Sequence, residues 1–157
     1  RDSSTSRGLG DVYKRQTQAS VTIDQKLYSE IGKGFLVLIG ICDEDTKETA
    51  DKMVRKLIGM RIFSDENGKT NLALKDVDGQ LLLVSQFTLY ADCKKGNRPS
   101  FVKAGSPQHA NELYEYIIDA CKKEVPVVKT GVFGAEMEVA LINDGPFTII
   151  LDSKDLA

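Results

Sequence analysis

The sequence is poor in the residue types on which many enzyme classes depend. Among its 157 residues are one histidine, no tryptophan and three cysteines. A Ser-His-Asp triad or a Cys-His dyad would have to use that histidine, His109, as its base, and a histidine zinc site would lack partners. His109 lies early in a predicted helix and faces away from the apolar stripe, so we expect an exposed side chain. These shortages argue against triad hydrolases and histidine metalloenzymes.

Long apolar runs and paired cysteines are also missing. The longest apolar run, FLVLIGIC at residues 35–42, is far shorter than the roughly 20 residues of a membrane-spanning helix. The first sixteen residues lack the continuous apolar segment of a secretory signal. Cys42, Cys93 and Cys121 are widely spaced and form no C-x-x-C pair, so neither a disulfide framework nor a zinc site is indicated. We therefore expect a cytoplasmic protein, and nothing in the sequence predicts a metal or another cofactor.

The composition is that of a folded domain: 41% of the residues are hydrophobic and 28% are charged. The formal net charge is −2, so the overall field of the protein does not attract nucleic acid. One local patch does carry positive charge without acidic residues, between Cys93 and Lys103, through Lys94, Lys95, Arg98 and Lys103. A phosphate backbone would bind favourably there, although an ordinary solvated loop has the same composition.

The chain divides into a short head and one domain. Residues 1–16 begin with Arg, mix charges and show no period that would bury a face, so we predict a non-native or disordered head in which residues 12–17 still pair as an edge strand. Residues 17–157 contain no repeat or linker and are read as a single domain.

Within that domain, apolar spacing predicts an α+β fold. Alternation at Val21 and Ile23 and the buried run 35–42 indicate strands, and LLLVSQFTLYA at residues 81–91 indicates another. Three-and-four spacing predicts helices over residues 46–59 and 107–123. Residues 127–152 are expected to close the fold as an antiparallel meander. The result is a curled, mostly antiparallel sheet or barrel with two helices.

Polar residues interrupt the strand predicted over residues 81–91. Ser85, Gln86 and Thr88 follow a buried Leu and Val run, and buried polar groups are costly unless they find partners or a ligand. Side chains alternate on a strand, so Gln86 and Thr88 are expected on one side, with Ser85 and Phe87 on the other. An exposed edge of the sheet explains the same pattern equally well.

Two further segments stand out. In Asn-Asp-Gly-Pro-Phe-Thr, residues 143–148, the proline marks a turn or a bulge, and the preceding glycine permits unusual backbone angles or a cis bond. Arg98-Pro99-Ser100-Phe101 places a rigid aromatic residue beside the basic patch, where it either stacks on a base or anchors a loop.

Together and in this order, these segments resemble the D-aminoacyl-tRNA deacylase family, from about Thr17 to Asp152. The resemblance is carried by TQASVT, GKGFLVLIGI, RIFSDENGKTNL, SQFTL, RPSF and NDGPFT. It implies hydrolysis of the ester bond of D-aminoacyl-tRNA, releasing tRNA and D-amino acid while L-aminoacyl-tRNA is rejected. Glycyl-tRNA mischarged on tRNA-Ala is a further implied substrate, because glycine has no side chain to exclude. The implied role is proofreading in translation.

The resemblance also implies site residues and a partner. The enzyme would be a homodimer in which a cis Gly145-Pro146 bond projects into the active site of the other subunit, where main-chain carbonyls meet the substrate amino group. Ser85, Gln86 and Thr88 would line the ester as catalytic residues, with backbone N–H groups near Gln86 as an oxyanion hole and Phe87 shaping the site. The segment from Arg98 to Phe101, including Pro99 and Ser100, would bind the end of the tRNA.

Some points stay open. Thr88 as a nucleophile would need a base, and no histidine is available, so we prefer water attack assisted by the ribose hydroxyl of the substrate. The head departs from the family because Gln16 stands where an apolar residue is expected. Two alternatives are a non-catalytic RNA-binding module and a hydrolase of D-amino-acid derivatives that does not require RNA.

Overall fold

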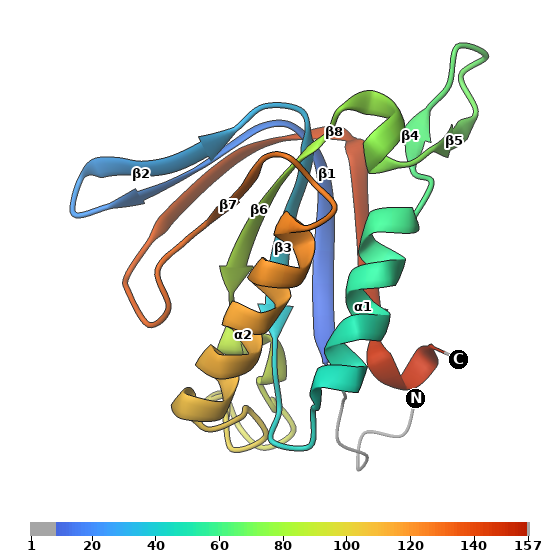
Figure 1. The fold of residues 1–157 in the computed structure, drawn as a ribbon. Coiled ribbons are helices and arrows are strands. Elements are labelled where there is room, and N and C mark those ends of the chain that lie inside the picture. Colours follow the sequence, from blue (N-terminus) through green and yellow to red (C-terminus); the bar gives the residue numbers. More distant parts are fainter. Residues whose placement is uncertain (1–8, 157) are drawn as a thin grey trace.

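The computed structural model describes residues 9–156, which form one mixed sheet, a small hairpin and two long helices (Figure 1). The strands are β1 (Gly10–Ile23), β2 (Lys26–Ile31), β3 (Gly34–Gly40), β4 (Phe63–Ser64), β5 (Thr70–Leu72), β6 (Gln80–Ser85), β7 (Val128–Thr130) and β8 (Glu138–Asp152). The helices are α1 (Lys47–Gly59) and α2 (Pro107–Lys122), with short 3-10 turns η1 (Leu74–Val77), η2 (Phe87–Tyr90) and η3 (Ser153–Asp155).

The long strand β1 organises the main sheet. Its first half pairs antiparallel with β3 and its second half with β2, while β8 runs antiparallel along nearly its whole length. Beyond β3 the sheet becomes parallel, because β6 pairs parallel with β3 and β7 parallel with β6. The predicted α+β class and curled sheet with two helices are confirmed.

Both helices begin at residues with strong capping side chains. The Thr46 hydroxyl accepts the Thr49 N–H and closes a reciprocal capping box before α1. Ser106 caps α2, and Pro107 occupies its first position. The predicted helices 46–59 and 107–123 therefore match α1 and α2 within one residue.

The two helices cover one face of the sheet, as Figure 1 shows, and bury their apolar stripes there. The main core joins residues of β3 and β6, such as Phe35 and Leu83, to Met53 and Leu57 of α1 and Ile117 of α2. Burial on this scale supplies about 25 cal/mol for each Å² of apolar surface removed from water. The core holds in place the C-terminal end of β6, where the polar segment begins.

The head differs from its prediction. Residues 10–16 belong to β1 and lie between β3 and β8, at the centre of the sheet rather than at an edge. The boundary expected after Gln16 therefore falls inside a strand, and Leu9 is already fully buried. Residues 1–8 lie outside the described residues, and the non-native origin of the head stays a prediction.

Polar residues of this segment are buried in the sheet. Asp11, Arg15 and Gln16 are at most 9% exposed. Gln16 Nε2 donates to the Gly32 carbonyl at 3.0 Å, whereas Gln16 Oε1 and Asp11 Oδ1 have no hydrogen-bond partner among the described residues. Burial, with a smaller contribution from the nearby Asp45, raises the pKa of Asp11 to about 8. The departure at Gln16 therefore leaves a buried polar atom unsatisfied.

The prediction of an antiparallel meander over residues 127–152 is also wrong. β7 is short and pairs with β6, while β8 pairs with β1 at the other side of the sheet. The two closing strands are therefore not neighbours. β8 continues from residue 138 to residue 152 through the Gly-Pro segment, because β1 offers a hydrogen-bonding partner on both sides of the interruption. Among the described residues, no helix is long and apolar enough to cross a membrane.

Candidate active site

A cavity of about 630 Å³ opens where β6 ends. Four segments distant in sequence form its walls: the residue after the end of β3, the end of β6 and the turn after it, the loop that enters α2 with the first turn of that helix, and the connection from β7 into β8. Its lining includes Val84, Ser85, Gln86, Phe87, Phe101, Ala104, Gly105, Pro107, Ala110, Phe133, Gly134, Ala135, Met137, Val139 and Ile41. None of these side chains titrates near neutral pH. The cavity therefore offers apolar and aromatic walls with two polar side chains, Ser85 and Gln86.

The polar segment turns away from the strand that precedes it. β6 ends at Ser85, and Phe87–Tyr90 forms the 3-10 turn η2. The extended strand expected through residue 91 is therefore wrong, and Ser85, Gln86 and Phe87 all line one cavity rather than opposite faces. Gln86 and Thr88 do lie on the same side, as predicted, because the Gln86 amide donates to the Thr88 hydroxyl. Thr88 stands beside the cavity on an exposed turn and is not among the lining residues.

The main chain of this turn carries free donors. The Gln86 N–H is occupied, since it donates to the Ile39 carbonyl at 2.7 Å. The N–H groups of Phe87 and Thr88, at the start of the 3-10 turn, have no acceptor among the described residues. Such unpaired donors at the beginning of a helical turn are available to an anionic oxygen. The donors nearest Gln86 are therefore those of the next two residues.

The Arg98–Phe101 segment joins the site through its aromatic residue. The Phe101 ring packs edge-on against Phe87, with ring centroids 5.1 Å apart, and both rings remain partly exposed at the cavity. Ser100 pairs with Asp92 through two main-chain hydrogen bonds, which fixes the base of the loop. Arg98 and Pro99 are exposed on the loop and do not line the cavity.

One cation of the basic patch forms an ion pair with an acidic residue that directly precedes the patch in the sequence. Lys103 forms an ion pair with Asp92 at 3.5 Å. The Lys94 N–H donates to the same carboxylate, and that hydrogen bond, with the Lys103 charge, lowers the pKa of Asp92. Lys94, Lys95 and Arg98 keep exposed charges without an ion pair among the described residues.

The wall formed by Phe133, Ala135 and Met137 was not foreseen from the sequence. The motif GVFGAEM indicated only a break between strands. In the structure, Met137 folds back over Gly131 and its sulfur accepts the Val132 N–H at 3.4 Å. A side chain at Gly131 would clash with that sulfur. The only signal for this wall in the sequence was an aromatic residue between two glycines.

The side chain of His109 was predicted to be exposed, and this prediction is wrong. His109 is half-buried, and its Nε2 lies 2.9 Å from the Asp45 carbonyl. That contact joins α2 to the loop before α1, where the buried Asp45 carboxylate accepts the N–H groups of Leu9 and Cys42. His109 does not line the cavity, and within residues 9–156 no cluster of His, Cys, Asp or Glu is arranged to hold a metal.

The Gly-Pro segment forms a wide bulge in β8. Lys14 and Gln16 of β1 pair with Thr148 and Asn143, so four residues of β8, 144–147, face Arg15 alone. The Gly145-Pro146 peptide bond is cis, and both residues are exposed. Gly145 has a φ of 119°, in the region that side chains disfavour. The bulge therefore presents main chain to the surface.

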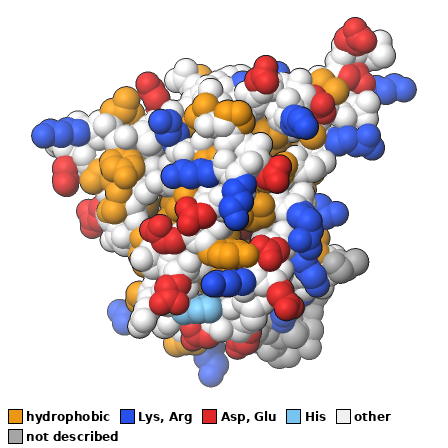
Figure 2. All heavy atoms as spheres, in the orientation of Figure 1, with side chains coloured by type: hydrophobic (Ala, Val, Ile, Leu, Met, Phe, Trp, Pro, Cys, Tyr) orange, Lys and Arg blue, Asp and Glu red, His pale blue; other side chains and the backbone are white. Residues whose placement is uncertain are grey.

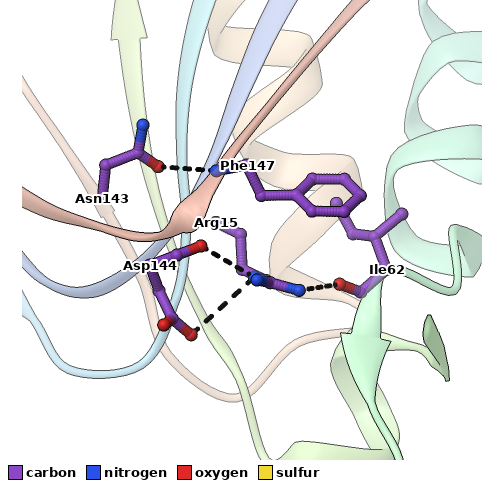
Figure 3. Close-up of polar contacts among 5 residues, drawn as sticks. All are labelled: Arg15, Ile62, Asn143, Asp144 and Phe147. Carbon is purple, nitrogen blue, oxygen red and sulfur yellow. Dashed lines mark hydrogen bonds and ion pairs between the residues drawn. The ribbon is translucent and has the colours of Figure 1, made fainter. Parts of the chain in front are cut away.

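Arg15 holds this bulge from behind (Figure 3). Its Nε donates to the Asp144 carbonyl at 3.1 Å and lies 3.7 Å from the Asp144 carboxylate. Its Nη1 donates to the Ile62 carbonyl at 2.8 Å, and its guanidinium lies over the Phe147 ring. The Asn143 amide faces the main chain of Phe147 across the bulge. A single buried side chain thus connects both ends of the bulge to the segment that follows α1.

The bulge and the cavity are separate within one chain. None of residues 143–148 is among those that line the cavity. The structure thus gathers Ser85, Gln86, Phe87 and Phe101 at the cavity, with Thr88 beside it, and places Gly145 and Pro146 elsewhere.

Comparison with known proteins supplies the family. The model of the D-Tyr-tRNA(Tyr) deacylase family matches residues 12–152. The chain is 52% identical to the D-aminoacyl-tRNA deacylase of Clostridium novyi and 50% identical to that of Thermosipho africanus, each over 91% of this chain and 96% of the relative.

Solved structures share the fold. One, described as a c-Myc DNA unwinding element binding protein, matches with a TM-score of 0.85 and 41% identity, over 90% of this chain and 97% of that one. Another, described as a probable eukaryotic D-amino acid tRNA deacylase, has a TM-score of 0.80 at 17% identity, over 92% and 98%. The segments that carry the sequence resemblance, the cavity and the bulge all fall within the range matched by the family model. The chain belongs to the D-Tyr-tRNA(Tyr) deacylase family.

Proposed function

We propose that this protein hydrolyses the ester bond of D-aminoacyl-tRNA in the cytoplasm and rejects L-aminoacyl-tRNA. The observation that carries the proposal is the pairing of two features in a member of this family: a cavity free of titratable side chains, and an exposed main-chain bulge held by a buried arginine. A cavity without an acid or a base suits a substrate that brings its own reactive group.

The reaction would depend on main-chain hydrogen-bond donors of the protein and on a hydroxyl group of the substrate. The free N–H groups of Phe87 and Thr88 point to an oxyanion hole for the tetrahedral intermediate, and such donors supply several kcal/mol of transition-state stabilisation. The Thr88 hydroxyl accepts a hydrogen bond from the Gln86 amide, and no base is among the described residues that line the adjoining cavity, so it orients the ester rather than attacking it. Water attacks the carbonyl carbon, the neighbouring ribose hydroxyl assists, and the ester C–O bond breaks to release tRNA and D-amino acid.

Handedness would be read by main chain from a second subunit. The bulge lies outside the cavity of its own chain, so we propose a homodimer in which residues 145–146 of each subunit enter the cavity of the other. Rigid main chain excludes an L side chain by steric contact and tolerates many D side chains. Glycine lacks a side chain, so glycyl-tRNA mischarged on tRNA-Ala would also be accepted. A mass measurement in solution tests the dimer directly.

The loop with Arg98 would contact the end of the tRNA. Phe101 already forms part of the cavity through its contact with Phe87, so it is placed to stack on the terminal base. Lys94 and Lys95 remain available to phosphates. Removing both charges should weaken tRNA binding and reduce its salt dependence, whereas salt-independent binding by the unmodified protein would contradict this role.

Three substrates test the proposal together. The protein is incubated with D-Tyr-tRNA, L-Tyr-tRNA and a D-tyrosine ester without RNA, and release of tyrosine is followed. We expect release from D-Tyr-tRNA alone. Absence of turnover, with tRNA still bound, would identify a non-catalytic RNA-binding module. Comparable cleavage of the simple ester would identify a hydrolase that does not require RNA.

A further inference from the structure

The outer face of α1 carries positive charge that neither the core nor the proposed site uses. Lys52, Arg55 and Lys56 are exposed, and none of them forms an ion pair among the described residues. Arg55 and Lys56 follow Lys52 by three and four positions, so both lie beside Lys52 on the helix surface, where like charges repel one another. The helix dipole favours Lys56, which lies in the last turn. We call Lys52, Arg55 and Lys56 the α1 basic face.

The three cations surround one hollow. Lys52, Arg55 and Lys56 line a surface depression of about 500 Å³ together with Gly59, Met60 and Leu156. Figure 2 shows Lys and Arg side chains gathered over α1, on the right flank of the molecule. Three positive groups around a common hollow present a concentrated positive field to an anion.

The acidic residues on the α2 side of this hollow do not line it. The Asp51 carboxylate is turned toward α2, where it accepts the Tyr116 hydroxyl at 2.7 Å. The exposed face of α2 carries Glu112, Glu115 and Asp119. The described residues that line the hollow of the α1 basic face include no acidic residue, whereas Asp119 and Glu124 border a second hollow that α1 shares with α2. A polyanion would be attracted to the first hollow rather than to the second.

The α1 basic face adjoins the segment that supports the bulge. α1 ends at Gly59, and the exposed Arg61 follows it closely. The carbonyl of the next residue, Ile62, accepts the hydrogen bond from Arg15, which holds the bulge. In the proposed dimer the bulge enters the partner cavity, so this end of α1 would stand near the mouth of that cavity.

We infer that the α1 basic face binds the sugar–phosphate backbone of the RNA substrate. This inference rests on the proposed function. It adds an RNA contact on α1 that is separate from the contact proposed for the Arg98 loop. RNA recognised this way is held through its phosphates without regard to base sequence. That suits a protein that must accept tRNAs of many sequences.

The test compares two variants of equal charge. One carries Lys52→Gln, Arg55→Gln and Lys56→Gln, since glutamine is a good helix former. The matched control carries Lys26→Gln, Lys69→Gln and Lys129→Gln, three exposed lysines on β2, the β4–β5 turn and β7. Circular dichroism and thermal melting confirm folding of both. Readouts are the KM and kcat for D-Tyr-tRNA, the affinity for uncharged tRNA at several salt concentrations, and turnover of D-tyrosyl-adenosine, which lacks phosphates.

We expect the α1 variant to raise the KM for D-Tyr-tRNA about tenfold at 0.1 M salt, with kcat unchanged. The slope of log affinity against log salt should fall by about 2 to 3, because each duplex phosphate contact contributes about 0.9. Turnover of D-tyrosyl-adenosine should not change, and the control variant should behave like the unmodified protein within about twofold, since only screened, long-range charge is lost.

Three results would overturn the inference: an unchanged KM for D-Tyr-tRNA, an equal loss in the control variant, or an equal loss with D-tyrosyl-adenosine. Displacement of tRNA from α1 by millimolar inorganic phosphate at constant ionic strength would instead identify a site for a small free anion, and would overturn it too. If the unmodified protein fails to hydrolyse D-Tyr-tRNA, the proposed function fails, and the affinities for uncharged tRNA decide the α1 inference alone.

Discussion

The two segments that carry the family pattern are built in opposite ways. Residues 85–90 leave the sheet in an open 3-10 turn, with exposed Phe87 and Thr88 and unpaired main-chain donors. Residues 143–148 bulge from the sheet as well, but Arg15 holds that bulge through Asp144, Ile62 and Phe147. The first segment leaves the N–H groups of Phe87 and Thr88 without an acceptor among the described residues, while the second has its main chain held by a buried side chain.

This difference fits two separate tasks. A segment that stabilises a developing charge needs donors that the protein itself does not consume. A segment that distinguishes enantiomers needs a position fixed to within a fraction of an ångström, because the two substrates differ only in the direction of one side chain. Substitutions that loosen the bulge should therefore affect selectivity and rate, and substitutions of hydroxyl groups in the open turn should affect little.

Gly145→Ala should have the largest effect. Gly145 has a φ of 119°, which side chains disfavour, and an added Cβ would lie 2.5 Å from Arg15 Nη2, so the bulge or the guanidinium that holds it must shift. We expect kcat/KM for D-Tyr-tRNA to fall about 100-fold, the scale of loss that a displacement of about 1 Å produces.

Gly68→Ala is the matched control. Gly68 also has a positive φ, of 76°, but no atom lies within 4 Å of its added Cβ, and it occupies the remote β4–β5 turn. A similar loss of activity in both variants would show that backbone strain alone, and not the position of the bulge, is responsible.

Arg15→Ala should destabilise the fold as well as the bulge. It removes a buried guanidinium, leaves the Asp144 and Ile62 carbonyls without that donor, and deletes the contact with Phe147. We expect a loss of about 4 kcal/mol in the free energy of unfolding, measured in urea, and measurable turnover of L-Tyr-tRNA under conditions where the variant is folded. Arg15→Lys keeps the charge without the planar guanidinium, and its stability should fall in between. Full stability in Arg15→Ala would show that Arg15 does not hold the bulge in place.

A substitution at Asp11 should change the pH dependence of stability without changing the bulge. Its folded pKa of about 8 lies above the ordinary value of 3.8 because the carboxyl is buried. The folded state therefore binds the proton more tightly than the unfolded state, and stability falls as pH rises between about 4 and 8.

Asp11→Asn should remove this dependence. Between pH 5 and pH 8 we expect the unmodified protein to lose on the order of 3 kcal/mol of stability, and the variant to show a nearly flat profile in thermal melting. The ratio of D to L turnover should be the same in both, because Asp11 lies outside the bulge. A parallel pH profile in the variant would assign the effect to another group.

Thr88→Ala should have the smallest effect. The Thr88 hydroxyl accepts a hydrogen bond from the Gln86 amide, and the described residues that line the adjoining cavity include no base, so its loss removes one orienting contact. We expect the single-turnover rate on D-Tyr-tRNA to stay within about threefold of that of the unmodified protein. Total loss of activity in a correctly folded variant would make Thr88 the nucleophile and would end the distinction between the two segments.

Local patterns were enough to predict much of the fold. Helix caps at Thr46 and Ser106 and the apolar stripes of α1 and α2 depend on neighbours within a turn or two, so sequence spacing contains them. The buried run 35–42 likewise matched β3. The closing strands failed because pairing partners distant in sequence, β6 for β7 and β1 for β8, decide where a strand lies, and apolar spacing does not name the partner.

The site was predictable where a motif lies on one segment. Ser85, Gln86, Phe87 and Phe101 were expected at the site and do line one cavity. Arg15 was missed because it lies in the segment that was predicted to be a non-native head. Its partners in the bulge, Asp144 and Phe147, are also about 130 positions away in the sequence. Phe133 and Met137 were missed because an apolar residue in a turn carries no chemical signature. His109 was expected in solvent because its acceptor, the Asp45 carbonyl, belongs to a distant loop.

The most direct test of the central claim, that main chain of one subunit reads the substrate bound in the other, is to restore activity by mixing two inactive variants. Gly145→Ala has an intact cavity, and Ala135→Trp fills the cavity but keeps the bulge. In a symmetric dimer, co-refolding equal amounts yields mixed dimers with one complete site, and the account predicts recovery of about one quarter of the unmodified activity on D-Tyr-tRNA. Mixed dimers that form, as seen by mass, but stay inactive would contradict it.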